Sequence, residues 1–365
     1  KAGIGRYVRS LVRAVARLDH ENAYVLLSAG RESDSAPWPS NVRIRTLPVT
    51  DRHLSIFWQK LRIPLPVEWL TGPLDLFHSP DYVLPPVHRA HTVLTIHDLS
   101  FMRLPECSSP QLLEYLLGAV PRSVARADLL LADSESTRQD LIELMHVASE
   151  RIRVIYPALD PSFYPRDDAE VQAVRARYGI VGPYILSVGT LQPRKNFVRL
   201  IEAYHTVWAA RDIPHRLVIA GGPGWLYEPI YEARERLHLQ DRVILPGFVE
   251  EQHLPALYSG ADLFAFPSLY EGFGFPVLEA MACNTPVITS NTSSLPEAAG
   301  RAALLVPPTD VDALAEAISQ GISNTALRQE LLRAGREQCG RFSWDQSAEQ
   351  LLAAYASLED GDGHV

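Results

Sequence analysis

The sequence predicts an α/β protein built from two consecutive halves, each with a parallel sheet covered by helices. Apolar strand-like runs alternate with helical patterns along the whole chain, and this alternation is typical of a parallel sheet with helices packed on it. The 365 residues are enough for two ordinary domains, each with its own core. Residues 160–168 contain two prolines and four charged residues, which indicates a linker between the halves.

In the first half, strand and helix patterns follow one another from the first residues. Strands are expected at residues 24–27, 42–47, 74–78, 92–97, 129–132 and 152–156, and helices at 6–18, 110–126 and 136–145. The chain begins in KAGIGRYV, and such a glycine turn normally follows a β-strand. We therefore expect the first strand of this domain to be missing, which leaves the domain incomplete at its start.

The second half repeats the alternation. Strands are expected at residues 184–188, 216–220, 243–246, 263–266, 287–289 and 303–306, and helices at 197–210, 228–237, 254–259, 276–283, 310–320, 326–335 and 344–358. We expect a first domain at 1–165, a second at 166–341, and a closing helix within 342–358 that packs back on the first. The two domains would face each other across a cleft at the carboxyl ends of both sheets, where ligands bind in such folds.

Composition argues against several classes of function. The net charge is −9, whereas a nucleic-acid-binding protein needs a basic face. Cys107, Cys283 and Cys339 are scattered, so they provide neither a disulfide framework nor a zinc spacing and indicate a reducing cytoplasm. No apolar run approaches the roughly 18 residues that span a bilayer, and we expect no secretory signal.

One segment, PSLYEGFGFPVLEAMACNTPVITS at residues 267–290, combines two carboxylates with a glycine turn and a helix start. Glu271 precedes the turn, and Pro276 suits the first position of a helix that carries Glu279. The backbone N–H groups of the turn would gather at the start of this helix, where unpaired donors and the helix dipole attract phosphate. An anion site flanked by two hydroxyl-binding carboxylates suits a ligand with a diphosphate and two sugars, such as a nucleotide-sugar.

A second motif, VGTLQPRKNFVRLI, places two cations between a strand and a helix. Arg194 and Lys195 come just before a helix that begins near Asn196. Cations are unfavourable at a helix N-terminus, so a bound anion explains them better than a solvated pair does. At the carboxyl edge of a sheet, Arg194 and Lys195 can stabilise the negative charge that develops on a leaving diphosphate.

Two histidines and two glycines complete the candidate residues. His97 ends an apolar strand in TIHDLSF, and His78 ends another strand in FHSP. A lone histidine in such a place is more often structural, and His78 is the weaker candidate of the two. Gly3 and Gly5 in GIGRYV would let the backbone approach a phosphate, although a G-x-G pattern alone is common in turns.

Together these motifs resemble the retaining glycosyltransferases of family four, which have the GT-B fold of two Rossmann-like domains. The resemblance covers most of the chain, is strongest in the second half, and is weaker in GIGRYV, TIHDLSF and FSWDQSAEQLLAAY. It implies that Glu279 binds the nucleotide ribose and that Glu271 lies beside the transferred sugar. It also implies backbone contacts of the turn with the sugar and diphosphate, so the donor-binding residues include Gly272, Phe273 and Gly274.

The resemblance also assigns roles to the first half. It implies that His97 contacts the donor sugar and that the loop with Gly3 and Gly5 binds phosphate. Retaining enzymes of this fold generally lack an obvious covalent nucleophile, so Asp98 is a poor candidate for one. The catalytic candidates are therefore Glu271, His97, Arg194 and Lys195.

The chain departs from the family pattern at two positions. Many members have an arginine directly after the glycine of the second motif, where this chain has Thr190. Lys195 matches the family lysine, and we expect Arg194 to supply the other charge. Asn284 stands where a glycine is usual, in a turn, and asparagine tolerates the left-handed conformation.

The first predicted helix carries a basic stripe. Arg6, Arg9, Arg13 and Arg17 fall on one face, opposite an apolar face. A solvated surface helix is the ordinary interpretation. The alternative is contact with anionic lipid headgroups or with a diphosphate-lipid acceptor, to which residues 51–70 would add aromatic and basic side chains.

We therefore expect a cytoplasmic, metal-independent retaining hexosyltransferase that needs no cofactor. Its donor would be a nucleotide-sugar, with GDP-mannose favoured by likeness to bacterial mannosyltransferases of polysaccharide synthesis. Its acceptor would be a glycan or a lipid-linked saccharide, and peripheral contact with the inner face of the membrane is left open. Two alternatives are a sugar-nucleotide epimerase on the same fold and a non-catalytic protein that binds sugar-nucleotides. A dinucleotide oxidoreductase fits least, because the G-x-G lacks a preceding strand and a ribose-binding acid.

Overall fold

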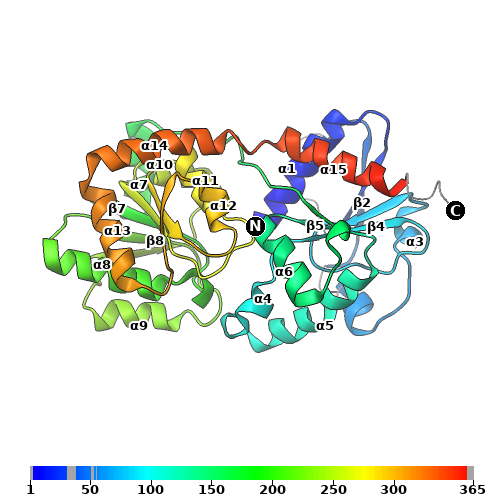
Figure 1. Ribbon diagram of the computed structural model, residues 1–365, viewed down its shortest axis with the longest axis horizontal. Helices are drawn as coiled ribbons and strands as arrows, with labels where there is room; N and C mark the ends of the chain where they lie inside the picture. The colour runs from blue at the N-terminus through cyan, green and yellow to red at the C-terminus, as the bar shows by residue number, and fades with distance from the viewer. Residues whose placement is uncertain (1–2, 31–37, 51–52, 55, 360–365) are drawn as a thin grey trace. The chain divides into compact units, whose positions relative to one another are not determined.

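The structure is a computed structural model that describes residues 3–30, 38–50, 53–54 and 56–359. Contacts within the chain divide it into two compact units. Unit 1 comprises Lys1–Leu99, Glu114–Ala158 and Ser343–Val365, and unit 2 comprises Ser100–Leu113 and Leu159–Phe342. Each unit is built on parallel strands with helices packed on them (Figure 1), which confirms the predicted α/β class.

Within the described residues, unit 1 contains two parallel sheets. The smaller sheet pairs β1 (Tyr24–Ala29) with β2 (Val42–Leu47), and the larger has the order β3 (Leu76–Ser79), β4 (His91–Ile96), β5 (Leu129–Ala132), β6 (Ile152–Val154). The central strands β4 and β5 are almost wholly buried, as expected for parallel strands covered on both faces. The helices here are α1 (Gly3–Leu18), α3 (Glu68–Thr71), most of α5 (Pro110–Arg126), α6 (Glu135–Met145) and α15 (Trp344–Glu359). α15 packs against α1 (Figure 1).

Unit 2 has one six-stranded parallel sheet with the order β12-β11-β10-β7-β8-β9. The bounds are β7 Tyr184–Val188, β8 Arg216–Ala220, β9 Val243–Gly247, β10 Leu263–Phe266, β11 Val287–Ser290 and β12 Ala303–Val306. The chain winds from β7 to β9 in one direction and from β10 to β12 in the other. Ligands of such sheets bind beyond the carboxyl ends of the strands where the winding reverses, which here is between β7 and β10.

Helices cover the unit 2 sheet and complete its core. Their bounds are α7 Asp168–Arg177, α8 Phe197–Arg211, α9 Glu228–Arg236, α10 Leu254–Ser259, α11 Phe275–Ala282, α12 Leu295–Ala299, α13 Val311–Ser323 and α14 Thr325–Cys339. The short helix α4 (Ser100–Arg103) is also assigned to unit 2. One cluster of buried apolar side chains joins β7, β8 and β10 to α8, α9 and α13. This core fixes the loops that leave the carboxyl ends of the strands.

Most predicted elements are present. Every predicted strand forms, with its ends within two residues of the predicted ones, and the predicted helices are present with ends within four residues. Helices α3, α4, α7 and α12 had not been predicted. Ser100–Leu113, expected with the first domain, counts with unit 2, where the Trp225 indole donates to the Cys107 carbonyl at 2.6 Å.

The predicted glycine turn before the first helix is wrong. Gly3 and Gly5 lie in the first turn of α1, and neither has a positive φ. Glycine weakens a helix by roughly 1 kcal/mol per residue, but packing of an apolar face provides most helical stability. Tyr7, Leu11 and Val15 bury such a face along α1, so the helix extends to Gly3.

Two further expectations concern a turn and the membrane. Asn284 adopts a φ of 62°, so the prediction that asparagine replaces glycine in a left-handed turn is confirmed. Among the described residues, no helix is long and apolar enough to cross a membrane.

Candidate active site

Three charged residues meet at the carboxyl edge of the unit 2 sheet. Arg194 and Lys195 lie in a short 3-10 turn after β7, and Glu271 follows β10. β7 and β10 are parallel neighbours, so the loops after them begin side by side where the winding reverses. Nη1 of Arg194 lies 2.9 Å from Oε2 of Glu271, and Nζ of Lys195 lies 2.6 Å from Oε1. We call these three residues the cation cluster.

The cation cluster has an excess of positive charge. Glu271 is 8% exposed, and burial alone would raise its pKa. Arg194, Lys195 and the Ser268 hydroxyl outweigh that effect and lower the pKa to about 2. Glu271 is therefore ionised at neutral pH, and two cations against one carboxylate leave a net positive charge suited to a phosphate.

The glycine turn after Glu271 ends at the start of a helix, as predicted. α11 begins at Phe275 with Pro276 in its first turn, and Gly274 precedes it with a φ of 112°. A Cβ on Gly274 would lie 2.9 Å from Cδ2 of Leu295, so both the backbone and the packing require glycine there. The first N–H groups of a helix have no intrahelical acceptor, which is the condition for the predicted phosphate contact.

Three serines that the sequence analysis did not single out hold this turn. The Ser268 hydroxyl donates to Oε1 of Glu271. The Glu271 N–H donates to Oγ of Ser293 at 3.0 Å, and Oγ of Ser294 donates to the carbonyl oxygens of Glu271 at 2.8 Å and Phe273 at 2.9 Å. Nothing in the sequence marks these serines, because buried loop serines and exposed ones have the same local pattern.

Glu279 lies on α11 and is 3% exposed. The Tyr258 hydroxyl donates to its Oε2 at 2.9 Å, which fixes the orientation of the carboxylate. Tyr258 had no signal in the sequence. The ribose contact of Glu279 stays a prediction.

Glycines of the loop after β8 bring the backbone against the loop that carries the cations. A Cβ on Gly221 would lie 1.9 Å from the carbonyl oxygen of Gly189, and one on Gly224 would lie 2.8 Å from that of Leu191. The Leu191 N–H donates to the Gly222 carbonyl, and the Gly224 N–H donates to the Leu191 carbonyl, both at 2.9 Å. Any larger residue at these glycines would push the loop that holds Arg194 and Lys195 away from β8.

His97 belongs to unit 1 and is bonded there through both ring nitrogens. Its Nδ1 lies 2.7 Å from Oδ2 of Asp133, and its Nε2 lies 2.9 Å from the Pro80 carbonyl oxygen. Burial alone would lower the His97 pKa, but Asp133 and, to a lesser degree, Asp81 and Pro80 raise it to about 9. The ring is therefore cationic at neutral pH. Its contact with a donor sugar stays a prediction, and such a contact would have to replace one of these bonds.

The structure also shows where the other candidates of unit 1, His78, Gly3 and Gly5, lie. His78 lies between the Tyr355 hydroxyl at 2.7 Å and the Thr95 hydroxyl at 2.8 Å, and burial lowers its pKa to about 3, so it is a neutral core histidine. Gly3 and Gly5 lie at the N-terminal end of α1. Within unit 2 the structure brings together the cation cluster, the turn 272–274 and the helix of Glu279.

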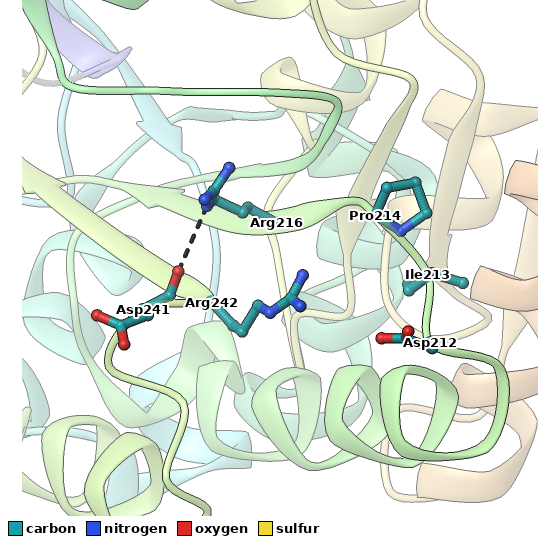
Figure 2. Close-up of a pocket in the computed structure, with 6 residues that line it drawn as sticks. All are labelled: Asp212, Ile213, Pro214, Arg216, Asp241 and Arg242. Atoms are coloured by element: carbon teal, nitrogen blue, oxygen red, sulfur yellow. Dashed lines mark hydrogen bonds between the residues drawn. The ribbon is translucent and has the colours of Figure 1, made fainter.

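A pocket of about 620 Å³ lies at the opposite edge of the unit 2 sheet. Its lining residues are Asp212, Ile213, Pro214, Arg216, Asp241 and Arg242 (Figure 2). Arg216 begins β8 and Arg242 directly precedes β9, so the pocket is at the amino ends of these strands. No predicted site residue lines it, and it is separate from the cation cluster.

Two family models together match most of this chain. Residues 2–163 match the family described as Glycosyltransferase Family 4, and residues 175–338 match Glycosyl transferases group 1. O-antigen chain mannosyltransferase B of Escherichia coli is 32% identical over 368 residues, which cover 98% of this chain and 96% of the relative. The serotype-specific mannosyltransferase WbdA of Escherichia coli is 33% identical over 73% of this chain and 33% of its own length.

A solved structure shows the same architecture along the whole chain. Sucrose-phosphate synthase from Thermosynechococcus elongatus superposes with a TM-score of 0.75 at 25% identity, and covers 99% of this chain and 94% of its own. The fold is therefore GT-B, with two Rossmann-like domains. The chain belongs to glycosyltransferase family four, and the protein is a glycosyltransferase enzyme.

Proposed function

We propose that this protein is a retaining hexosyltransferase that moves mannose from GDP-mannose to a glycan or a lipid-linked saccharide during polysaccharide synthesis. The observation that carries the proposal is the net positive cation cluster where the unit 2 winding reverses, next to the start of α11. The choice of mannose is supported by the names of the O-antigen mannosyltransferases that the chain resembles.

In the proposed reaction, Arg194 and Lys195 stabilise the charge that grows on the diphosphate as its bond to the sugar breaks. Glu271 keeps both cations at the sheet edge, and with a pKa of about 2 it has no proton to donate. The acceptor hydroxyl attacks the sugar on the face from which the diphosphate leaves. The departing phosphate oxygen takes the acceptor proton, so no side chain forms a covalent bond to the sugar.

Metal independence is part of the proposal. Among the described residues, no group of three or more His, Cys, Asp and Glu side chains could hold a metal ion. The two cations of the cluster can supply the charge stabilisation that a metal supplies in other transferases. Activity that survives EDTA supports the proposal, whereas activity lost to EDTA and restored by Mn²⁺ contradicts it.

The experiment that tests the function is a donor panel with and without acceptor. A ligand that binds only the folded state raises the melting temperature, so GDP-mannose should raise it more than UDP-glucose or UDP-GlcNAc. Release of GDP should then require a glycan or lipid-linked saccharide acceptor. Sugar release or inversion without acceptor favours the epimerase, and a melting shift without any turnover favours the non-catalytic binding protein.

We also propose that unit 1 contacts an anionic membrane when the acceptor is lipid-linked. The basic stripe of α1 is partly engaged inside unit 1, because Arg17 pairs with Asp345 of α15 and the Arg13 guanidinium lies 4.5 Å from the Trp38 ring centre. Exposed apolar side chains support the contact, since Trp69 is 77% exposed and Leu61 is 61% exposed.

A further inference from the structure

We propose that Ser293 and Ser294, the serine seat, are positioning residues of the transfer reaction, because they hold the turn that carries Glu271. The inference rests on the proposed function, since it concerns the same donor site. Both residues follow β11, on the loop that leads into α12. They reach the turn after β10 from the neighbouring strand of the sheet.

Three hydroxyl hydrogen bonds of the serine seat end on the backbone of residues 271–273. Ser294 is fully buried, and its Oγ lies 2.8 Å from the Glu271 carbonyl oxygen and 2.9 Å from that of Phe273. Oγ of Ser293 accepts from the Glu271 N–H at 3.0 Å and donates to the Thr292 carbonyl at 2.7 Å. The two hydroxyls therefore fix the N–H and the C=O of Glu271 itself.

Backbone geometry marks the seat as a constrained feature. Ser293 has a φ of 52°, a conformation that costs a residue other than glycine of order 1 kcal/mol or more and persists only where the surroundings impose it. Helix α12, which follows the seat, packs directly against the same turn. A Cβ on Gly274 would lie 2.9 Å from Leu295 and 3.6 Å from Ala298. The turn is thus held from the β11 side by hydrogen bonds and by packing.

The placement of Glu271 decides where the two cations lie. Arg194 also donates to the Tyr270 carbonyl at 2.6 Å, and its own carbonyl accepts from the Leu269 N–H at 2.8 Å. The segment 269–271 therefore aligns the cation cluster through backbone and carboxylate together. A displaced Glu271 moves the charges that must face the leaving diphosphate, and a misplacement of about 1 Å can cost about a hundredfold in rate.

Buried serines often donate a hydrogen bond to a backbone carbonyl for structural reasons alone. The chain contains a second such serine, which serves as a matched control for a purely structural role. Ser187 of β7 is fully buried, and its Oγ donates to the Ala265 carbonyl at 2.6 Å. S187A and S294A therefore remove the same kind of bond from the same unit. Only S294A removes it from the turn that carries Glu271.

The test measures kcat and KM for the donor in wild type, S187A and S294A, at a temperature where all three are folded by circular dichroism. We expect S294A to lower kcat about tenfold or more, and S187A to stay within about twofold of wild type, at similar losses of melting temperature. Equal kcat in S294A and S187A would overturn the inference. If wild type transfers no hexose with any donor, the proposed function fails instead.

A double-mutant cycle separates positioning from general destabilisation. If Ser294 acts through Glu271, S294A should reduce kcat by less than about twofold when it is added to E271Q. The same tenfold loss in both backgrounds would overturn the inference. Should S294A fail to fold, S293G removes the acceptor of the Glu271 N–H without adding backbone strain. S293G should then lower kcat more than S187A does. Equal kcat in S293G and S187A would overturn the inference that the serine seat positions Glu271.

Discussion

Both units contain buried ionised side chains that pair with each other at the carboxyl ends of parallel strands. The two groups differ in net charge and in hydrogen bonding. In unit 1, His97 and Asp133 balance each other, and the remaining ring nitrogen of His97 is bonded to the Pro80 carbonyl. In unit 2, Arg194 and Lys195 share Glu271, which leaves a net positive charge. A balanced pair fastens loops, whereas an unbalanced one attracts an anion. We therefore expect the net positive cation cluster to bind the diphosphate of the donor, while the contact of His97 with the donor sugar stays a prediction.

Lys195→Ala should have the largest effect. Charge grows on the diphosphate as its bond breaks, so loss of the lysine should lower kcat by roughly a hundredfold to a thousandfold and change KM little. Steady-state kinetics with the donor would measure both constants. Arg242→Ala in the pocket at the amino edge of the same sheet (Figure 2) is the control, and it should leave kcat within about twofold. A raised KM with an intact kcat would contradict the assignment.

Glu279→Ala should weaken nucleotide binding. One charge-assisted hydrogen bond to the ribose is lost, which costs roughly 1.5–3 kcal/mol. Calorimetric titration of the donor nucleotide into wild type and variant would measure the loss. Tyr258→Phe keeps the carboxylate and removes only its hydroxyl partner, so it should cost less than Glu279→Ala. Unchanged affinity of Glu279→Ala would remove this residue from the ribose site.

The balanced pair of unit 1 should give a pH-dependent stability. The folded pKa of His97, about 9, lies above the ordinary value of 6.5, so its contribution is fully present below about pH 6.5 and is lost as the pH rises through about 9. The free energy of unfolding should then fall by up to about 1.4 kcal/mol per pH unit in that window. Urea unfolding of wild type and Asp133→Asn measures this, because the variant should lose most of the slope. Equal slopes in the two proteins would mean that His97 is not held as a cation.

The basic stripe of α1 should give the smallest effect. Vesicles with anionic lipid should bind wild type at low salt and release it as salt rises, because exposed charges are screened over about 10 Å at 0.1 M. Each arginine contributes on the order of 1 kcal/mol at most. Replacing Arg6, Arg9, Arg13 and Arg17 with glutamine should abolish co-sedimentation and leave donor affinity unchanged. A wild type that ignores anionic vesicles at low salt would show that the stripe is only a solvated face.

The sequence predicted the fold from local patterns, and local patterns together with the resemblance to family four located the candidate residues of unit 2, whose roles stay predictions. Apolar alternation located the strands, and the Pro276 helix start and the two cations before α8 gave local signals for unit 2. The contacts between distant segments could not be predicted. Ser294 and Tyr258 reach Glu271 and Glu279 only because β11 and α10 fold against the turn and α11. The misjudged start of α1 has a related cause, since tertiary packing of Tyr7 and Leu11 outweighed the local preference of two glycines.

The most direct test of the central claim is whether the cation cluster binds the diphosphate. Calorimetry would compare the affinity of GDP with that of guanosine, in wild type and in an Arg194→Ala, Lys195→Ala variant. If the cluster holds the diphosphate, wild type should prefer GDP by at least about a hundredfold, since two charge-assisted bonds contribute roughly 1.5–3 kcal/mol each, and the variant should lose most of that preference. An undiminished preference for GDP in the variant would place the diphosphate elsewhere and contradict the account.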